Sequence, residues 1–267
     1  MTILKTPAIW PPSSYIRPIK AEHGGQRAYT HFAELRDPDG KPCRGYVKHF
    51  PANFHRALFN EWFGYTVLSS LGVPQPACAI MQAPVLNDPA GIVAWAFVSC
   101  EPRPAFEGTP KELYNSKDAE QLKALTRRLF NCPSLPLMIA ADQLLMNDDR
   151  NLGNLVFTSK SAFVAIDHAD ILGGASWVDN PLLKPTNWAT SKLIEKLVDI
   201  NDLSPNLKSS LVASAEIVQE SFYLMQTDLK AALECSANGE SSIAMDAVWW
   251  RCAEISQWFK LRLQFVV

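Results

Sequence analysis

The part of this sequence that most constrains its fold is the segment from Asp142 to Asn154, together with residues 164–168 a short distance further on. The segment contains the pair Asp149-Arg150, and its final asparagine lies five positions after Asp149. A further acid, Asp167, stands at the end of an apolar run of the kind that forms a strand. This order predicts a polar loop, a short strand, a turn and a second strand, which bring three oxygen-bearing side chains together.

These residue types are the ones that phosphoryl transfer from ATP requires. A carboxylate receives the proton of the acceptor hydroxyl, while an amide oxygen and a second carboxylate hold magnesium. The offset between Asp149 and Asn154 equals that of the protein-kinase catalytic loop, H-R-D-x-x-x-x-N, and Asp148 does not share it. We therefore assign Asp149 as the residue that orients and deprotonates the acceptor, and Asn154 and Asp167 as metal ligands. An Asn-Asp-Asp cluster by itself also fits an ordinary polar turn.

A lysine and a glutamate upstream fit the same chemistry. Lys48 lies in the run 46–50, which has the character of a strand, and the helix expected after it carries Glu61. In protein kinases a helix glutamate holds the strand lysine that neutralises the α- and β-phosphates. Lys48 and Glu61 are therefore candidates for this ion pair. The alternative is a lysine on a strand edge that is simply solvated.

The segment 22–29 contains Gly24 and Gly25 between two expected strands. Adjacent glycines allow backbone N–H groups to approach phosphate oxygens, so these two residues are candidates for a phosphate-covering loop. The segment lacks the G-x-G-x-x-G pattern, and a plain turn is the alternative. The chain has neither G-x-x-x-x-G-K-[ST] nor G-x-S-x-G, which disfavours P-loop enzymes and α/β-hydrolases.

Composition limits the class of protein. The 267 residues suffice for one large domain or two lobes, and 48% apolar with 19% charged residues is typical of a globular protein. A formal charge of −2 disfavours a protein that binds nucleic acid mainly through phosphate contacts. No apolar run has the length of a transmembrane helix, and the six cysteines form no C-x-x-C pair. We therefore expect a cytoplasmic protein with free thiols, no membrane contact and no direct nucleic-acid binding.

Hydrophobic periodicity and turn signals divide the chain into a β-rich part and a helical part. Strands are expected over 28–35, 45–50, 77–82 and 92–100, with one helix over 55–71 that Gly72 ends. Helices are expected over 122–130, 136–146, 191–198, 205–233 and 241–265, the last packed through its aromatic residues. The predicted fold class is α+β, with a bilobal protein-kinase-like architecture. We expect a single domain over 1–267, with a β-rich N-terminal lobe over about 1–100 and a mainly helical C-terminal lobe over about 105–267.

The sequence resembles the HipA-like kinases, in particular the short form of that kinase domain without the extra N-terminal region. The resemblance covers roughly residues 20–190 and rests on Val47-Lys48, Asn60-Glu61, Asn147-x-Asp149-Arg150-x-x-x-Asn154 and Ile166-Asp167-His168. It implies the fold shared by protein kinases and phosphatidylinositol kinases, with ATP and Mg2+ at the site. It also implies adenine contacts in the connection that runs from Val98 through Cys100 to Glu101.

By the same resemblance the chain would phosphorylate serine or threonine of a protein substrate, as the toxin of a toxin–antitoxin module whose partner is an antitoxin or another small regulatory protein. Lipid headgroups fit less well, because the segment 169–192 carries no net charge whereas a phosphoinositide favours a basic acceptor region. Two departures from related sequences stand out: Asn151 replaces a histidine, and Asp167-His168-Ala169 replaces Asp-Phe-Gly. Asn151 and the glycine segment motivate a second hypothesis, a nucleotide-binding regulator with little transfer activity. A third hypothesis is the transfer of AMP in place of phosphate.

Overall fold

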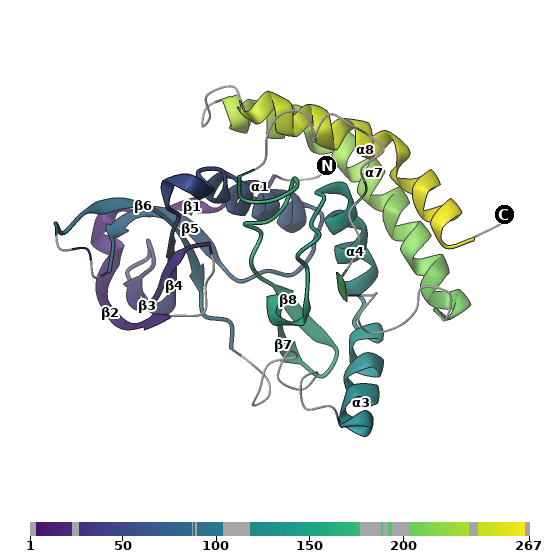
Figure 1. Ribbon diagram of the computed structural model, residues 1–267, viewed down its shortest axis with the longest axis horizontal. Helices are drawn as coiled ribbons and strands as arrows, with labels where there is room; N and C mark the ends of the chain where they lie inside the picture. The colour runs from purple at the N-terminus through teal and green to yellow at the C-terminus, as the bar shows by residue number, and fades with distance from the viewer. Residues whose placement is uncertain are drawn as a thin grey trace.

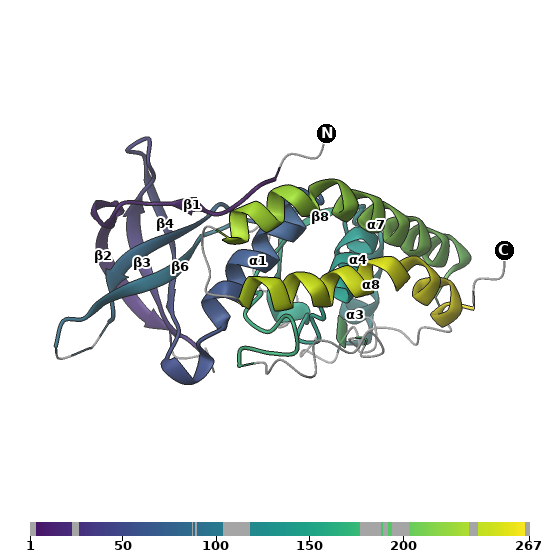
Figure 2. The ribbon, with the colours of Figure 1, turned by 90° about the horizontal axis from the view of Figure 1, so that it is seen from above.

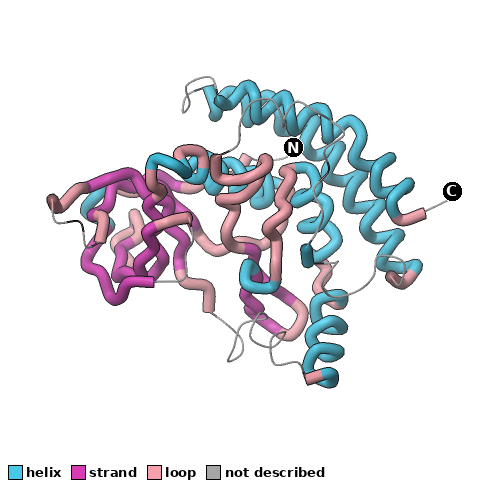
Figure 3. The backbone as a smooth tube through the Cα atoms, in the orientation of Figure 1, coloured by secondary structure: helices cyan, strands magenta, loops and turns pink. Residues whose placement is uncertain are grey.

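The computed structural model describes residues 4–22, 27–86, 88, 90–103, 118–176, 188, 192–193, 203–234 and 240–264. These residues form two lobes, with most strands in one and the long helices in the other (Figures 1 and 3). Helix α1 (Ala57–Ser70) lies between the sheet and the helical lobe in both perpendicular views (Figure 2). The predicted order, a β-rich lobe followed by a mainly helical lobe, is confirmed.

The N-terminal lobe is built on a six-stranded sheet with the order β1-β5-β6-β4-β3-β2. Its strands are β1 (Ala8–Ile9), β2 (Tyr15–Glu22), β3 (Tyr29–Arg36), β4 (Pro42–His49), β5 (Cys78–Pro84) and β6 (Val93–Cys100). β1 runs parallel to β5, and the other pairings are antiparallel. Trp10, Leu35, Val47 and Met81 belong to a small core against this sheet. Strand β4, which carries Lys48, therefore lies inside the sheet with β3 and β6 on its two sides.

The C-terminal lobe packs its helices around a larger apolar core. They are α3 (Ala119–Phe130), α4 (Leu135–Leu144), α7 (Pro205–Glu234) and α8 (Glu240–Arg262). α7 and α8 run side by side, and both contact α4 (Figure 1). Asp118 caps α3 by accepting hydrogen bonds from the backbone N–H groups of Glu120 and Gln121. α4 leads directly into the polar segment that the sequence singles out.

A short hairpin brings the two predicted metal ligands to one place. Strands β7 (Leu155–Ser159) and β8 (Ala162–Ala165) are antiparallel, with Leu155 opposite Ala165. The N–H of Ile166 donates a 3.0 Å hydrogen bond to the carbonyl of Asn154, so the pairing continues one step beyond the strands. Asn154 enters the hairpin and Asp167 leaves it at the same end.

Helix α1 is buried on most sides because it lies between the two lobes. Phe63 and Leu68 belong to the larger core, while the polar residues Asn60 and Glu61 are also fully buried. The apolar positions whose spacing predicts this helix are 58, 62, 65, 68 and 71. The last two are buried, whereas the first three are only half-buried. The side of α1 that carries Asn60 and Glu61 is thus a polar side turned into the protein.

Several sequence predictions can be compared with the structure directly. Ile255 and Phe259 of α8 and Leu263 just after it are buried as expected, whereas Trp249 and Trp250 are 39% and 55% exposed and do not pack in the core. The five described cysteines are free thiols. Among the described residues, no helix combines the length and the apolar character needed to span a bilayer. The helix expected over 191–198 lies largely outside the described residues.

Gly64 allows α1 to lie directly against the turn that follows β8. A Cβ atom at this position would lie 2.6 Å from Cβ of His168 and 3.0 Å from its Cγ. We expect Gly64→Ala to lower the free energy of unfolding by about 1–3 kcal/mol, because overpacking outweighs a gain of about 1 kcal/mol in helix propensity. Urea denaturation measures the change. A variant at least as stable as the wild type would contradict this close approach.

Candidate active site

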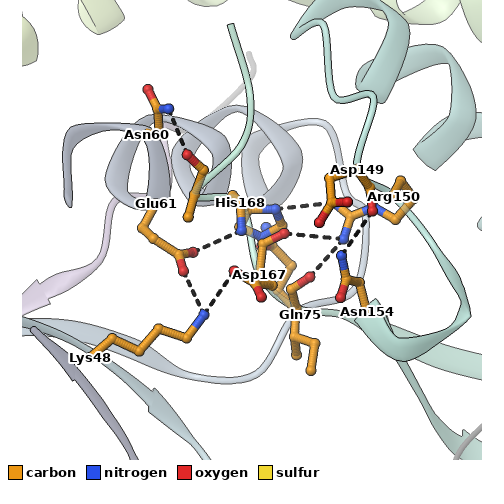
Figure 4. A network of polar contacts seen from close by, with 11 residues as sticks. Lys48, Asn60, Glu61, Gln75, Asp149, Arg150, Asn154, Asp167 and His168 are labelled. Carbon is orange, nitrogen blue, oxygen red and sulfur yellow. Dashed lines mark hydrogen bonds and ion pairs between the residues drawn. The ribbon is translucent and has the colours of Figure 1, made fainter. Parts of the chain in front are cut away.

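Lys48 and Glu61 are in contact, as their positions along the chain predict. Lys48 Nζ donates a 2.6 Å hydrogen bond to Oε1 of Glu61, whose side chain is fully buried. The other oxygen, Oε2, accepts a 2.9 Å hydrogen bond from the backbone N–H of His168. A single buried carboxylate thus connects strand β4, helix α1 and the turn after β8 (Figure 4).

Asp167 lies on the other side of the same lysine. Its Oδ1 accepts a 3.0 Å hydrogen bond from Lys48 Nζ, and 45% of its side chain is exposed. Partial burial alone would raise the pKa of Asp167, but the ammonium of Lys48 outweighs it and lowers the pKa to about 2. Burial would likewise lower the pKa of Lys48, but Asp167 and Glu61 raise it. Both side chains are therefore charged at neutral pH.

The backbone at Asp167 is held in an unusual conformation. Its φ of 65° lies in the left-handed region, which residues other than glycine seldom adopt. This sharp turn lets the side chain of Asp167 contact Lys48 while the next N–H, of His168, contacts Glu61. Backbone strain of this kind persists where the surroundings hold the chain firmly.

Arg150 is the buried group that holds the turn in place. Its Nε and Nη2 bond the two oxygens of Asp142 at 2.9 and 3.1 Å. On the other side, Nη1 donates to the carbonyl of Ile166 at 2.6 Å, and Nη2 lies 3.1 Å from Nδ1 of His168. Arg150 thus links the loop that carries Asp149 to the turn that carries Asp167.

His168 is neutral and has a defined tautomer. Gln75 donates through Nε2 to the carbonyl of Tyr65 and to Oγ of Ser69, so its oxygen faces His168 at 2.6 Å. Nε2 of His168 therefore carries the proton, and Nδ1 accepts from Arg150. Burial lowers the pKa of His168 well below its usual value, and Arg150 adds to the effect. The side chain that departs from Asp-Phe-Gly has a structural function here.

The side chain of Asn60 holds the backbone of the segment after His168. Its Nδ2 lies within hydrogen-bonding distance of three carbonyls, those of Ala169, Ile171 and Gly174, at 2.7, 3.1 and 3.0 Å. The resemblance to known sequences includes Asn60 but gives it no function. The contacts with Gln75 and Asn60 could not be predicted, because each partner is far away in the sequence and belongs to no short motif.

Asp149 and Asn154 meet on the opposite side of the turn from Lys48 and Glu61 (Figure 4). Nδ2 of Asn154 donates to the carbonyl of Asp149 at 3.2 Å, and Asn151 donates to the same carbonyl at 2.8 Å. The side chain of Asp149 is 42% exposed and therefore accessible to another molecule. The NH2 group of Asn154 is thus directed to Asp149, and the amide oxygen is the atom of this side chain that can bind a cation.

The predicted nucleotide contacts are only partly within the described residues. Gly24 and Gly25 lie outside them. Val98 is fully buried in the small core, between Val47 and Ala79 in the sheet. Cys100 is half-buried at the end of β6. Their contact with a nucleotide stays a prediction.

The surroundings of the turn are rich in carboxylates. Asp170 contacts Arg27, the first described residue after Gly24 and Gly25. Burial raises the pKa of Asp170 to about 6; Arg27 opposes the rise, and the negative charges of Asp149, Asp167 and Asp148 add to it. Additional positive charge at this place would therefore relieve repulsion among the four acids.

The fold is similar to that of a solved kinase. A proinflammatory kinase from Helicobacter pylori, CtkA, superposes with a TM-score of 0.62 over 97% of this chain and 98% of that chain, at 16% sequence identity. No family model matches the chain, and no curated protein matches it. The chain thus has the bilobal kinase-like fold that its sequence predicts.

The buried pair of Arg150 and Asp142 generates a stability prediction. Burial raises the pKa of Asp142, and Arg150 and Asn147 oppose the rise by holding the charged form. We expect Arg150→Met to cost about 3–5 kcal/mol, because it leaves a buried carboxylate without its partner. The double variant Asp142→Asn/Arg150→Met removes that charge, keeps an acceptor for Asn147, and should cost less than the single variant. Urea denaturation of both would contradict the assignment if the double variant were the less stable one.

Proposed function

We propose that this chain is an ATP- and Mg2+-dependent kinase that transfers the γ-phosphoryl group to a serine or threonine hydroxyl of a protein. The observation that carries the proposal is the contact of Lys48 with both Glu61 and Asp167, across the turn from Asp149 and Asn154. A cation for phosphates, two oxygen donors for a metal and an accessible carboxylate for a hydroxyl are thus gathered in one place. The kinase-like fold supports the same function.

The donor set fits Mg2+. Within the described residues, no three His, Cys, Asp or Glu side chains are grouped as ligands of one metal ion. Mg2+ needs no such cage, since it is commonly held by one or two side-chain oxygens, water and the phosphates of its substrate. Asp167 offers an ionised oxygen and Asn154 a neutral one. When bound there, the ion neutralises charge on the phosphates.

The other side chains of the proposed site have separate functions in phosphate binding, proton transfer and support. Lys48 binds the α- and β-phosphates, and Glu61 keeps its ammonium in place from the buried side. Asp149 orients the acceptor hydroxyl and takes its proton as the bond to phosphorus forms. Arg150, His168 and Asn60 contact neither substrate; they fix the loop and the turn that carry the reacting groups.

Asn151 does not weaken this proposal. Its Oδ1 accepts from the N–H of Gly153 at 2.8 Å, and its Nδ2 donates to the carbonyl of Asp149. The residue that departs from related sequences therefore caps the short helical turn 152–154 and supports the backbone of Asp149. A nucleotide-binding regulator stays the alternative that the experiment must separate.

The choice of a protein acceptor rests on charge and on resemblance. The net charge of the segment 169–192 is zero, which favours a protein hydroxyl over an anionic lipid headgroup as the acceptor. The resemblance to HipA-like kinases extends the proposal to a toxin with an antitoxin partner. A radiolabelled assay on the translation components of a cell extract, with and without the product of the neighbouring gene, tests this extension.

The activity itself is tested with radiolabelled ATP, Mg2+ and a Ser/Thr-rich protein acceptor. We expect transfer by the wild type and a loss of at least about 100-fold in Asp149→Asn, the scale of a missing acid–base group. Asp167→Asn should lose Mg2+-dependent turnover, and chelation by EDTA should stop the wild type. Asp148→Asn is the matched control, because Asp148 is an exposed neighbouring acid outside the proposed machinery, and it should retain activity.

The outcomes separate the three hypotheses. A wild type that is stabilised by ATP and Mg2+ against thermal unfolding but transfers nothing is a regulator. An acceptor that gains the mass of AMP identifies adenylyl transfer. Equal rates in Asp149→Asn and Asp148→Asn would refute the assignment of Asp149.

A further inference from the structure

Lys192 lies beside the proposed acid–base residue, although no motif includes it. Its Nζ is 3.3 Å from Oδ1 of Asp149, across 43 positions of sequence. The side chains of Lys192 and Asp149 are each 42% exposed, so the pair lines an accessible surface. An exposed ion pair of this kind contributes little to stability.

Two described residues close to Lys192 in the sequence make apolar contacts. The next residue, Leu193, is 2% exposed and belongs to the larger core. Four positions earlier, the ring of Trp188 stacks on Trp258 of α8, with centroids 5.0 Å apart and planes 18° from parallel. Leu193 thus ties the residue next to Lys192 to the core of the C-terminal lobe.

The loop that carries Asp149 supplies no cation of its own to this carboxylate. Arg150 is fully buried and directs its guanidinium to Asp142 and to the turn 166–168. Lys48 is occupied by Glu61 and Asp167 on the nucleotide side. Asp149 is one of three acids, with Asp148 and Asp167, whose negative charges act on the nearby Asp170. A donor from outside the loop is what can hold the Asp149 carboxylate in one orientation.

We propose that Lys192 is a positioning residue for the transfer, which acts by orienting the carboxylate of Asp149 towards the acceptor hydroxyl. This inference rests on the proposed function. In the step concerned, the acceptor oxygen forms a bond to the γ-phosphorus and the bond from that phosphorus to the β,γ-bridging oxygen breaks, with ADP as leaving group. The hydroxyl proton passes to Asp149. In a loose transition state, alignment of the attacking oxygen is a large part of catalysis, so a carboxylate free to rotate loses rate.

The test measures transfer by Lys192→Met with radiolabelled ATP at saturating Mg2+. We expect kcat to fall about 10- to 100-fold while KM for ATP stays within about 2-fold, since the interaction serves the chemical step and not nucleotide binding. Lys192→Arg, which keeps the charge and the donor, should recover most of the rate. Lys160→Met is the matched control, because this exposed lysine lies in the turn between β7 and β8, and it should behave as wild type.

A double variant distinguishes positioning from a general structural effect. If Lys192 acts through Asp149, then adding Lys192→Met to Asp149→Asn should lower the residual rate by less than about 2-fold. Full multiplication of the two losses, or a Lys192→Met variant with wild-type kcat, overturns the inference while the proposed function stands. A wild type without any transfer overturns both. Loss of ATP affinity in Lys192→Met together with a lowered melting temperature would also contradict it.

Discussion

The candidate site depends on one buried carboxylate. Glu61 has no exposure to solvent, and each of its oxygens is used: one by the ammonium of Lys48, the other by the backbone N–H of His168. A buried carboxylate is costly unless it is paired and hydrogen-bonded, so this one is stable only while both partners are present. The strand that carries Lys48 and the turn that carries Asp167 belong to different lobes, and Glu61 fixes their separation. The geometry of the proposed site follows from that contact.

A second set of buried polar groups holds the same turn from the other lobe. Arg150 pairs with Asp142 and bonds the carbonyl before Asp167, while His168 lies between Arg150 and Gln75. Such networks are favourable only when every member is satisfied, and here the tautomer of His168 and the orientation of the Gln75 amide follow from their neighbours. The turn therefore has little freedom, although Asp167 itself adopts a backbone conformation that is rare for its residue type. Rigid support of reactive groups lowers the cost of ordering them at the moment of reaction.

The sequence predicts the parts of this site that are local. Asp149, Asn154 and Asp167 lie within one loop and one hairpin, so spacing and strand pattern suffice to place them together. The Lys48–Glu61 contact follows from a strand and a helix that adjoin along the chain. Periodicity cannot predict that α1 turns a polar side inwards, because that depends on its place between two lobes. Periodicity also cannot predict the contact of Gln75 with His168, or the contact of Lys192 with Asp149. Both contacts depend on the tertiary fold.

The central claim is that Asn154 and Asp167 hold one divalent ion beside phosphates bound by Lys48. A crystal structure of the protein with Mn2+ and a non-hydrolysable ATP analogue tests it most directly, since Mn2+ is located by anomalous scattering. The account predicts an ion within about 2.0–2.4 Å of Oδ1 of Asn154 and of an Asp167 oxygen, with Lys48 Nζ on the α- or β-phosphate. An ion bound away from both residues, or a triphosphate that does not reach Lys48, would contradict it.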